Sequence, residues 1–297
     1  GPGSEVGEYL AASSRVNVIS FTGSREVGTR LLHIGAQLQP GQTHVKRVIA
    51  EMGGKNAIIV DADADLDEAV PGVVQSAFGF QGQKCSAASR VIVTGNLYAA
   101  FVERLVEAAQ SLTVGDPQQP GHFLGPVIDA VAHARIGKLV AAGRQRARLL
   151  SGTAASLPEE GYFIAPQIFT DVDPQDTLAQ EEIFGPVLAV LRADDFEQAL
   201  DIANATAYAL TGGVYSRYPA HLAHACEAFR VGNLYLNRGI TGARVSRQPF
   251  GGFRLSGTGG KAGGPDTLLQ YVDTVCVTEN TLRRGFAPDI GSGSESA

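Results

Sequence analysis

Short runs of β-branched and apolar residues alternate along this chain with longer segments whose apolar positions recur at helical spacing. Residues 16–21 predict a strand, Thr22-Gly23-Ser24 a turn, and residues 25–38 a helix. Further strands are expected at 58–60, 89–94, 163–170, 187–191 and 213–215, and further helices at 66–77, 97–111, 130–150, 196–206 and 221–229. Because strands that alternate with helices tend to pair in parallel, this pattern predicts an α/β fold with a largely parallel sheet.

Glycine changes the pattern towards the end of the chain. Seven glycines fall within residues 251–264, which predicts a long loop that passes close to another group or adopts positive φ angles. Residues 286–297 end in Gly-Ser-Gly-Ser-Glu-Ser-Ala, a composition typical of a disordered tail.

Composition narrows the class of protein. The chain has 297 residues, of which 44% are hydrophobic and 18% charged, as expected for a globular protein with room for two domains. Its net charge is −6 and its Lys and Arg residues are scattered, which argues against nucleic acid or a membrane surface as partner and favours a small molecule. Neither a membrane span nor a secretory signal is visible, so we expect a cytoplasmic protein.

The three cysteines are far apart, without CxxC pairs or nearby histidines. This spacing predicts neither a disulfide framework nor a metal site. Cys85 follows a glycine-containing turn and is flanked by Lys84, Ser86 and Arg90, whose charges would lower the thiol pKa if they converged on it. From local sequence alone, however, a small inert core residue is the more common outcome for Cys85, and Cys226 and Cys276 fit that interpretation.

Three other segments contain candidate chemistry. The Thr22-Gly23-Ser24 turn opens into a helix, whose free N–H groups could bind a phosphate, although Ser24 is also an ordinary helix cap. Glu51 precedes two glycines and is a candidate general base or a solvated surface residue. Glu182, the second of two adjacent acids, could bind ribose hydroxyls or merely be exposed.

Taken together and in order, these motifs resemble the aldehyde dehydrogenase superfamily. The resemblance rests on five segments: Phe21-Thr22-Gly23-Ser24, Glu51-Met52-Gly53-Gly54-Lys55-Asn56, Gly82-Gln83-Lys84-Cys85, Glu182-Ile183-Phe184-Gly185-Pro186 and Pro249-Phe250-Gly251-Gly252. It implies a three-layer catalytic domain, NAD as cofactor and an aldehyde as substrate.

The resemblance also implies roles for individual residues. Cys85 would be the nucleophile, its backbone N–H would help hold the oxyanion, and Glu51 would be the base that activates water for thioester hydrolysis. Gly23 and Ser24 would contact the pyrophosphate of NAD, Glu182 the nicotinamide ribose, and Phe184 the nicotinamide.

Within the superfamily, the chain is most similar to the branch that oxidises glutamate γ-semialdehyde, or 1-pyrroline-5-carboxylate, to glutamate in the second step of proline catabolism. The similarity lies in Lys84-Cys85-Ser86-Ala87, residues 237–243, Gln248-Pro249-Phe250-Gly251-Gly252 and Lys261-Ala262-Gly263-Gly264-Pro265. It implies that Ser86 and the N–H groups of Gly242 and Ala243 bind the substrate carboxylate, and that Phe250 lines the aldehyde channel.

The resemblance predicts a domain division as well. Residues 1–52 would be the last part of a Rossmann-type cofactor domain, 53–253 the catalytic domain, 254–285 a return segment with an oligomerisation strand, and 286–297 a tail. Earlier parts of the family's cofactor domain do not precede Gly1. We therefore expect a homo-oligomer in the full-length parent, located in the cytoplasm or, in a eukaryote, the mitochondrial matrix. Another semialdehyde substrate, or a truncated non-catalytic domain that serves in assembly, are the alternatives.

Overall fold

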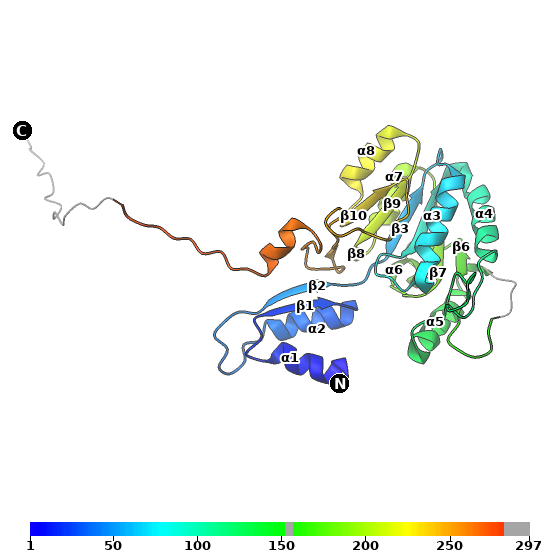
Figure 1. Ribbon diagram of the computed structural model, residues 1–297. Coiled ribbons are helices and arrows are strands. Elements are labelled where there is room, and N and C mark those ends of the chain that lie inside the picture. The colour runs from blue at the N-terminus through cyan, green and yellow to red at the C-terminus, as the bar shows by residue number, and fades with distance from the viewer. Residues whose placement is uncertain (152–156, 282–297) are drawn as a thin grey trace, which may run out of the picture.

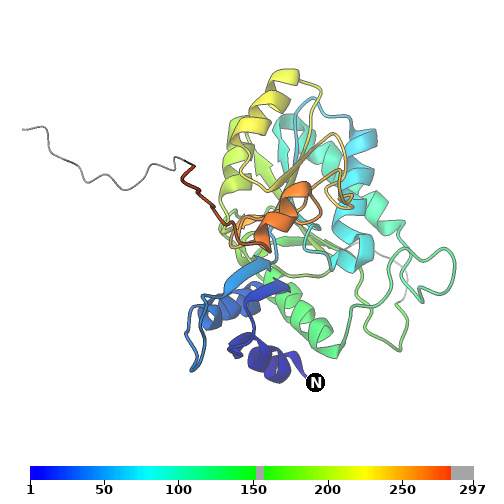
Figure 2. The same ribbon diagram turned by 60° about the vertical axis from the view of Figure 1, so that its left-hand side comes forward.

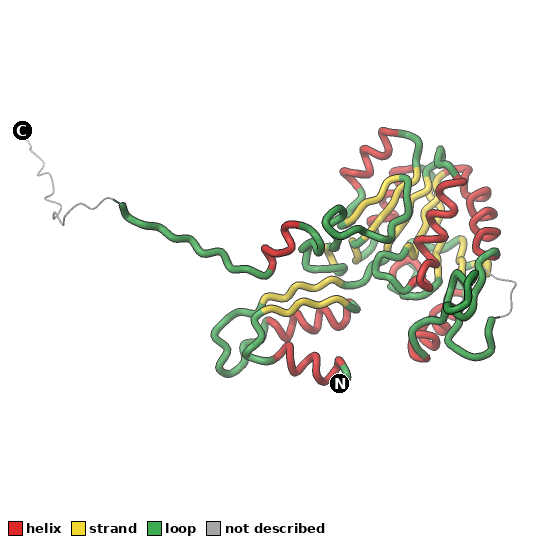
Figure 3. The backbone as a smooth tube through the Cα atoms, in the orientation of Figure 1, coloured by secondary structure: helices red, strands yellow, loops and turns green. Residues whose placement is uncertain are grey.

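The computed structural model describes residues 1–151 and 157–281. Figure 1 shows a large sheet with helices on both faces, and beside it a smaller layer of two strands with two helices beneath them. The C-terminal segment leaves this body as an extended chain, drawn as green loop in Figure 3.

The large sheet has seven strands within the described residues, in the order β10-β9-β3-β4-β7-β6-β5. All neighbouring pairs are parallel except β5 with β6 at one edge. The strands are β3 (Asn56–Val60), β4 (Ala88–Thr94), β5 (Arg148–Ser151), β6 (Gln167–Thr170), β7 (Val187–Ala193), β9 (Thr211–Tyr215) and β10 (Asn233–Leu236).

Alternate residues of each central strand face two separate cores. Ile58 and Val60 of β3 lie in the core under α3 (Leu66–Phe78) and α4 (Tyr98–Gln110), whereas Ala57 and Ile59 lie in the opposite core. The helices that cover the opposite core are α5 (Ala130–Gly143), α6 (Thr177–Gln180), α7 (Phe196–Asn204) and α8 (Pro219–Ala228). Burial on both faces explains why the strands are almost continuously apolar.

The smaller unit contains α1 (Glu8–Ala12), β1 (Val18–Thr22), α2 (Arg25–Gly35) and β2 (Arg47–Glu51), preceded by a π-helical turn at Gly3–Gly7. β1 and β2 are parallel, and α1 and α2 pack on them through Ala11, Ile19 and Leu31. The chain passes from this unit to the large sheet through residues 52–55.

The final segments form a further two-stranded sheet and pack against the small unit. β11 (Phe253–Arg254) pairs antiparallel with β8 (Tyr208–Ala209), and a 3₁₀ helix follows at Pro265–Gln270. In Figures 1 and 2 this orange helix lies next to the β1–β2 layer. Arg47 donates hydrogen bonds to the carbonyl oxygens of Gln270 and Val272, at 2.9 and 3.1 Å, and pairs with Asp273 at 2.8 Å.

Most predicted elements are present, with one error of type. The helix expected over 130–150 ends at Gly143, and residues 148–151 form strand β5 instead. A Cβ at Gly143 would lie only 2.9 Å from the Leu178 side chain, so the helix end packs tightly against α6. The chain then turns and pairs with β6. β2, β8, β10, β11 and α6 were not predicted at all.

The predictions that Cys226 and Cys276 are core residues are wrong, and the predicted tail lies outside the described residues. Cys226 on α8 and Cys276 in the extended C-terminal segment are exposed, not core residues. The expected tail at 286–297 lies outside the described residues. No helix in the described ranges is both long and apolar enough to cross a lipid bilayer.

Candidate active site

Cys85 lies in a tightly held loop between α3 and β4. Phe80, Gln81 and Gly82 adopt φ angles of 57°, 56° and 66°, the left-handed region that costs energy for residues other than glycine. A Cβ on Gly82 would lie 2.3 Å from the carbonyl oxygen of Gly185, so this position requires glycine. The strained turn directs the chain towards the beginning of β4.

The loop is fastened by a buried asparagine at the start of β3. Nδ2 of Asn56 donates to the carbonyl oxygens of Cys85 at 2.7 Å and Ala87 at 2.8 Å. Its Oδ1 accepts a hydrogen bond from the N–H of Thr211 at 3.0 Å. One side chain therefore connects β3, β9 and the cysteine loop, and it fixes the backbone position of Cys85.

The environment of the thiol differs from the sequence expectation. Burial raises the pKa of Cys85, the nearby charges of Glu182 and Glu51 raise it as well, and the N–H of Ser86 acts in the opposite direction. The flanking cations do not converge on the sulfur: Lys84 lies 5.6 Å from the centre of the Phe80 ring, and Arg90 points elsewhere. The resting thiol is therefore protonated near neutral pH.

Arg90 holds main-chain segments together by hydrogen bonds. Its guanidinium group is buried and donates to three main-chain carbonyl oxygens, those of Lys55 at 3.0 Å, Ile202 at 2.9 Å and Ala203 at 2.8 Å. These bonds join the start of β3 to the end of α7. An arginine so fully engaged holds the backbone and is not aimed at the thiol.

Glu51 is the last residue of β2, and its side chain is partly buried in the same region. Burial raises the pKa of Glu51 to about 7, opposed by the N–H of Gly252 and the charge of Lys261. That N–H lies 3.4 Å from Oε2 of Glu51. A Cβ at Gly251 would lie 2.7 Å from Oε1, so a glycine at this position leaves room for the carboxylate. A carboxyl group that titrates near 7 suits proton transfer in neutral solution.

Glu182 is held by a glycine pair. The N–H of Gly54 donates to Oε1 of Glu182 at 3.1 Å, and a Cβ on Gly53 would come within 1.9 Å of Oε2. Burial raises the pKa of Glu182, whereas the Gly54 N–H and Lys55 lower it. Phe184 follows at φ 52° with 40% of its surface exposed.

Gly23 and Ser24 directly precede the first residue of α2. Oγ of Ser24 accepts the N–H of Val27 at 3.3 Å, which is ordinary N-capping. The N–H of Gly23 is already bonded to the carbonyl oxygen of Glu51 at 3.1 Å, so it is not free for a phosphate. The first turn of α2 still presents N–H groups and the positive end of the helix dipole.

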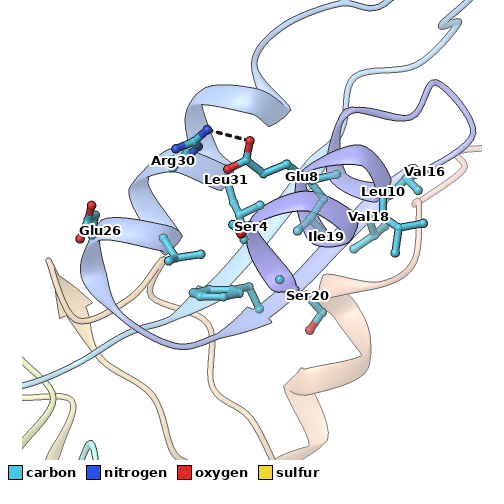
Figure 4. A pocket seen from close by; sticks show the side chains of 15 residues that line it. Ser4, Glu8, Leu10, Val16, Val18, Ile19, Ser20, Glu26, Arg30 and Leu31 are labelled. Carbon is cyan, nitrogen blue, oxygen red and sulfur yellow. Dashed lines mark hydrogen bonds and ion pairs between the residues drawn. The ribbon is translucent and has the colours of Figure 1, made fainter. Parts of the chain in front are cut away.

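Sequence analysis did not predict the cavity beside this helix. It has a volume of about 610 Å³, and its lining is mainly apolar. Figure 4 shows side chains from α1, β1 and α2 around it, including Val16, Val18, Ile19 and Leu31, with Glu8 and Arg30 paired at 2.7 Å. A flat apolar group fits such a lining.

The residues expected to bind the substrate come from three segments. Ser86 is buried beside Cys85, and its carbonyl oxygen accepts a hydrogen bond from Oγ1 of Thr211 at 3.3 Å. Gly242 and Ala243 follow Ile240, whose N–H is bonded to Oγ of Ser76 at 3.1 Å; Gly242 is exposed with φ 79°. Within the described residues, no hydrogen bond joins Ser86 to Gly242 or Ala243.

Phe250 precedes the two glycines that contact the Glu51 carboxylate. It is partly buried and forms a two-bond antiparallel bridge with Ala262, with N–O distances of 2.9 and 2.7 Å. The structure brings Glu51 and Glu182 close enough to Cys85 for their charges to act on the thiol. Gly23 and Ser24 lie on the small unit, as Glu51 does. Within the described residues, no group of three or more His, Cys, Asp or Glu side chains could hold a metal ion.

Three residues of the site had no role predicted from sequence: Lys55, Asn56 and Lys261. All three lie in segments that carried the family resemblance, and their roles depend on contacts between distant segments. Lys55 is 1% exposed, and its Nζ has no hydrogen-bond partner among the described residues. Burial and Arg90 lower the pKa of Lys55 to about 7, although Glu182 acts in the opposite direction.

Comparison with known proteins identifies relatives. Residues 1–277 match the sequence model described as "Aldehyde dehydrogenase family". The 1-pyrroline-5-carboxylate dehydrogenase of Geobacillus thermodenitrificans (strain NG80-2) is 52% identical over 279 residues, which are 94% of this chain and 54% of that protein. The protein of that name from Bacillus subtilis (strain 168) is 48% identical with the same coverage. The chain thus spans about half the length of the curated relatives it matches.

Solved structures agree with this placement. A 1-pyrroline-5-carboxylate dehydrogenase from Thermus with bound NAD has a TM-score of 0.89 and 52% identity, covering 92% of this chain and 52% of that one. Proline utilization A from Bdellovibrio bacteriovorus has a TM-score of 0.92 and 57% identity, covering 97% and 30%. Lactaldehyde dehydrogenase from Escherichia coli has a TM-score of 0.85 but 35% identity, covering 93% and 56%.

Proposed function

Because the chain belongs to the aldehyde dehydrogenase family, we propose that it forms the thiol-bearing part of an enzyme that oxidises L-glutamate γ-semialdehyde to L-glutamate with NAD. The observation that supports this most directly is the placement of Glu51, with a pKa of about 7, close enough to Cys85 for its charge to raise the thiol pKa. A nucleophile and a base poised near neutral pH are the two groups that such an oxidation needs.

The reaction follows from these two side chains. Glu51 accepts the proton of the Cys85 thiol, and the thiolate attacks the aldehyde carbon to give a hemithioacetal, whose oxygen faces the N–H of Cys85. NAD, when bound, supplies the hydride acceptor that converts this adduct to a thioester. Glu51 releases the first proton to solvent and then takes a proton from water. The hydroxide attacks the thioester, the Cys85 thiolate leaves and is reprotonated by Glu51, and glutamate departs.

The residues present fit a dinucleotide. In our proposal the pyrophosphate binds at the first turn of α2, next to Ser24 and near Gly23. The adenine enters the apolar cavity of about 610 Å³ that Val27 and other residues of α2 also line. At the other end, Glu182 accepts hydrogen bonds from the nicotinamide ribose, and Phe184 flanks the nicotinamide.

The substrate is proposed from the loop that contains Gly242 and Ala243 and from the relatives. Gly242, with its left-handed backbone, and Ala243 present main-chain N–H groups on an exposed loop, an arrangement that binds carboxylates. Ser86, next to the nucleophile, is proposed to donate its hydroxyl to the same carboxylate, and Phe250 to form the wall of the aldehyde channel. Relatives named for 1-pyrroline-5-carboxylate are about 50% identical to this chain.

The test is the appearance of NADH when the purified chain is mixed with NAD and 1-pyrroline-5-carboxylate. We expect absorbance to rise, Cys85→Ser to abolish the rise, and Cys226→Ser, a matched change of an exposed cysteine, to leave the rate unchanged. A rise that persists in Cys85→Ser would exclude the proposed nucleophile. A series of semialdehydes that differ in chain length, measured in parallel, tests the substrate.

NAD titration by calorimetry tests the cofactor separately. Saturable binding that weakens when Glu182→Gln is introduced supports the proposed nicotinamide site. If the chain binds no NAD and produces no NADH, the proposal fails for the isolated chain, and the alternative of a non-catalytic domain that serves in assembly is favoured.

A further inference from the structure

Lys261 has an ammonium group held at three points beside the proposed base. Its Nζ donates to the carbonyl oxygens of Gly232, at 2.5 Å, and Gly251, and to Oδ1 of Asn233 at 3.2 Å. A lysine ammonium has three N–H donors, so all of them have an acceptor here. A side chain held in this way has a fixed position, unlike a solvated surface lysine.

One of these acceptors, Gly251, belongs to the segment that contacts Glu51, and a second, Asn233, holds the same segment. Asn233, at the start of β10, donates from Nδ2 to the carbonyl oxygen of Pro249 at 2.9 Å and accepts from the N–H of Gly251 at 3.2 Å. Lys261 and Asn233 therefore both hold residues 249–251 through hydrogen bonds to the main chain. The next N–H along the chain, that of Gly252, is the donor to the Glu51 carboxylate.

Lys261 also acts on Glu51 through its charge. Among the described residues, Lys261 and the Cys85 thiol are the titratable groups that interact with Glu51. Burial lowers the pKa of Lys261, whereas Glu51 raises it, as expected for opposite charges close together. The ammonium thus counteracts the effect of burial on the pKa of the Glu51 carboxyl group.

We propose that Lys261 is the positioning residue of the base: it fixes the peptide whose N–H binds the Glu51 carboxylate, and it places a positive charge beside that carboxylate. The proposal rests on the proposed function, because it assigns to Glu51 the hydrolysis of a Cys85 thioester. Lys261 touches neither the thiol nor the substrate in this arrangement. Its effect reaches the reaction through Glu51 alone.

Hydrolysis of p-nitrophenyl acetate tests this without NAD. The Cys85 thiolate attacks the ester carbonyl, p-nitrophenolate leaves, and an acetyl thioester forms on the sulfur. Water then attacks the thioester while Glu51 takes its proton, acetate leaves, and the proton returns to the thiolate. The release of p-nitrophenol is followed at the wavelength at which its protonated and ionised forms absorb equally. Formation of the thioester gives an initial burst of product, and hydrolysis of the thioester sets the steady rate that follows.

In the parent chain we expect the steady rate to rise with pH around a midpoint near 7, where Glu51 ionises. Lys261→Gln retains hydrogen-bond donors but removes the charge, so the midpoint should move up by at least about half a pH unit. The rate well below the midpoint should then fall about threefold or more, whereas the rate above about pH 8.5 stays within about twofold. Lys261→Arg restores the midpoint, and Lys138→Gln, an exposed lysine on α5, leaves the profile unchanged.

The outcomes separate the two proposals. A parent chain without a burst contradicts the proposed function, and the inference falls with it. A burst with the same midpoint in the parent and in Lys261→Gln overturns the inference alone, as does a rate that drops equally at every pH. A midpoint that persists in Glu51→Gln assigns the titration to another group and also overturns it.

Discussion

Replacing Lys55 by methionine should change how the stability of the protein depends on pH. Lys55 is 1% exposed, its Nζ has no hydrogen-bond partner among the described residues, and burial lowers its pKa to about 7. In the unfolded chain the same amine titrates at about 10.5. Between these two values the unfolded state binds one more proton than the folded state. Stability must therefore rise with pH across this window.

The size of the effect follows from the two pKa values. One pKa unit corresponds to about 1.4 kcal/mol, so the contribution of Lys55 to the free energy of unfolding should increase by about 2 to 3 kcal/mol between about pH 7.5 and pH 9.5. Lys55→Met retains most of the apolar side chain and removes the amine. The variant should be more stable than the parent near neutral pH and lose that advantage in alkaline solution.

Urea denaturation of both proteins at a series of pH values measures this directly. Only the difference between parent and variant is used, because tyrosines such as Tyr215, whose pKa burial raises to about 12, titrate equally in both. Lys138→Met provides the matched control for an exposed lysine and should give no pH-dependent difference. If parent and Lys55→Met change in parallel with pH, Lys55 is charged in the folded state and the argument from its burial is wrong.

Three further substitutions test how the site is held. Asn56→Ala removes the donors to the Cys85 loop and the acceptor for Thr211, and we expect a loss of about 3 kcal/mol by urea denaturation together with a slower p-nitrophenolate burst. Gly53→Ala places a Cβ 1.9 Å from Glu182 and should weaken NAD binding by about tenfold in calorimetry, with little change in the burst. Arg90→Met leaves three carbonyl oxygens without their donor and should lower the free energy of unfolding by about 3 kcal/mol or more.

The sequence predicted the α/β class because central strands buried on both faces are continuous apolar runs, as in residues 58–60 and 187–191. It failed where an element depends on its neighbours. Residues 130–150 have a composition that a helix tolerates throughout, yet the close packing of Gly143 against Leu178 ends α5 and pairing with β6 makes 148–151 a strand. β2 was not predicted because it is a short strand of a two-stranded sheet and depends on pairing with β1.

The same limit applied to the site. Motifs located Glu51, Cys85 and Glu182, because each adjoins glycines that only a close approach explains. Neighbours in sequence misled us about the thiol: Lys84 and Arg90 flank Cys85 along the chain, but their side chains point to a phenyl ring and to main-chain carbonyl oxygens. Lys261 could not be linked to Glu51 before the fold placed the two loops together. Predictions of the remaining site roles and of the domain boundaries remain to be tested.

The link between the two sheets has a mechanical consequence. Glu51 ends β2 of the small sheet, whereas Cys85 lies just before β4 of the large one, separated from it by Ser86 and Ala87. Only residues 52–55 connect the sheets along this path. The junction is supported by hydrogen bonds from Met52 N–H to the Ser256 carbonyl oxygen at 2.8 Å and from Thr258 N–H to the Ala50 carbonyl oxygen at 2.9 Å. A rotation of one sheet relative to the other therefore changes the separation of base and nucleophile directly.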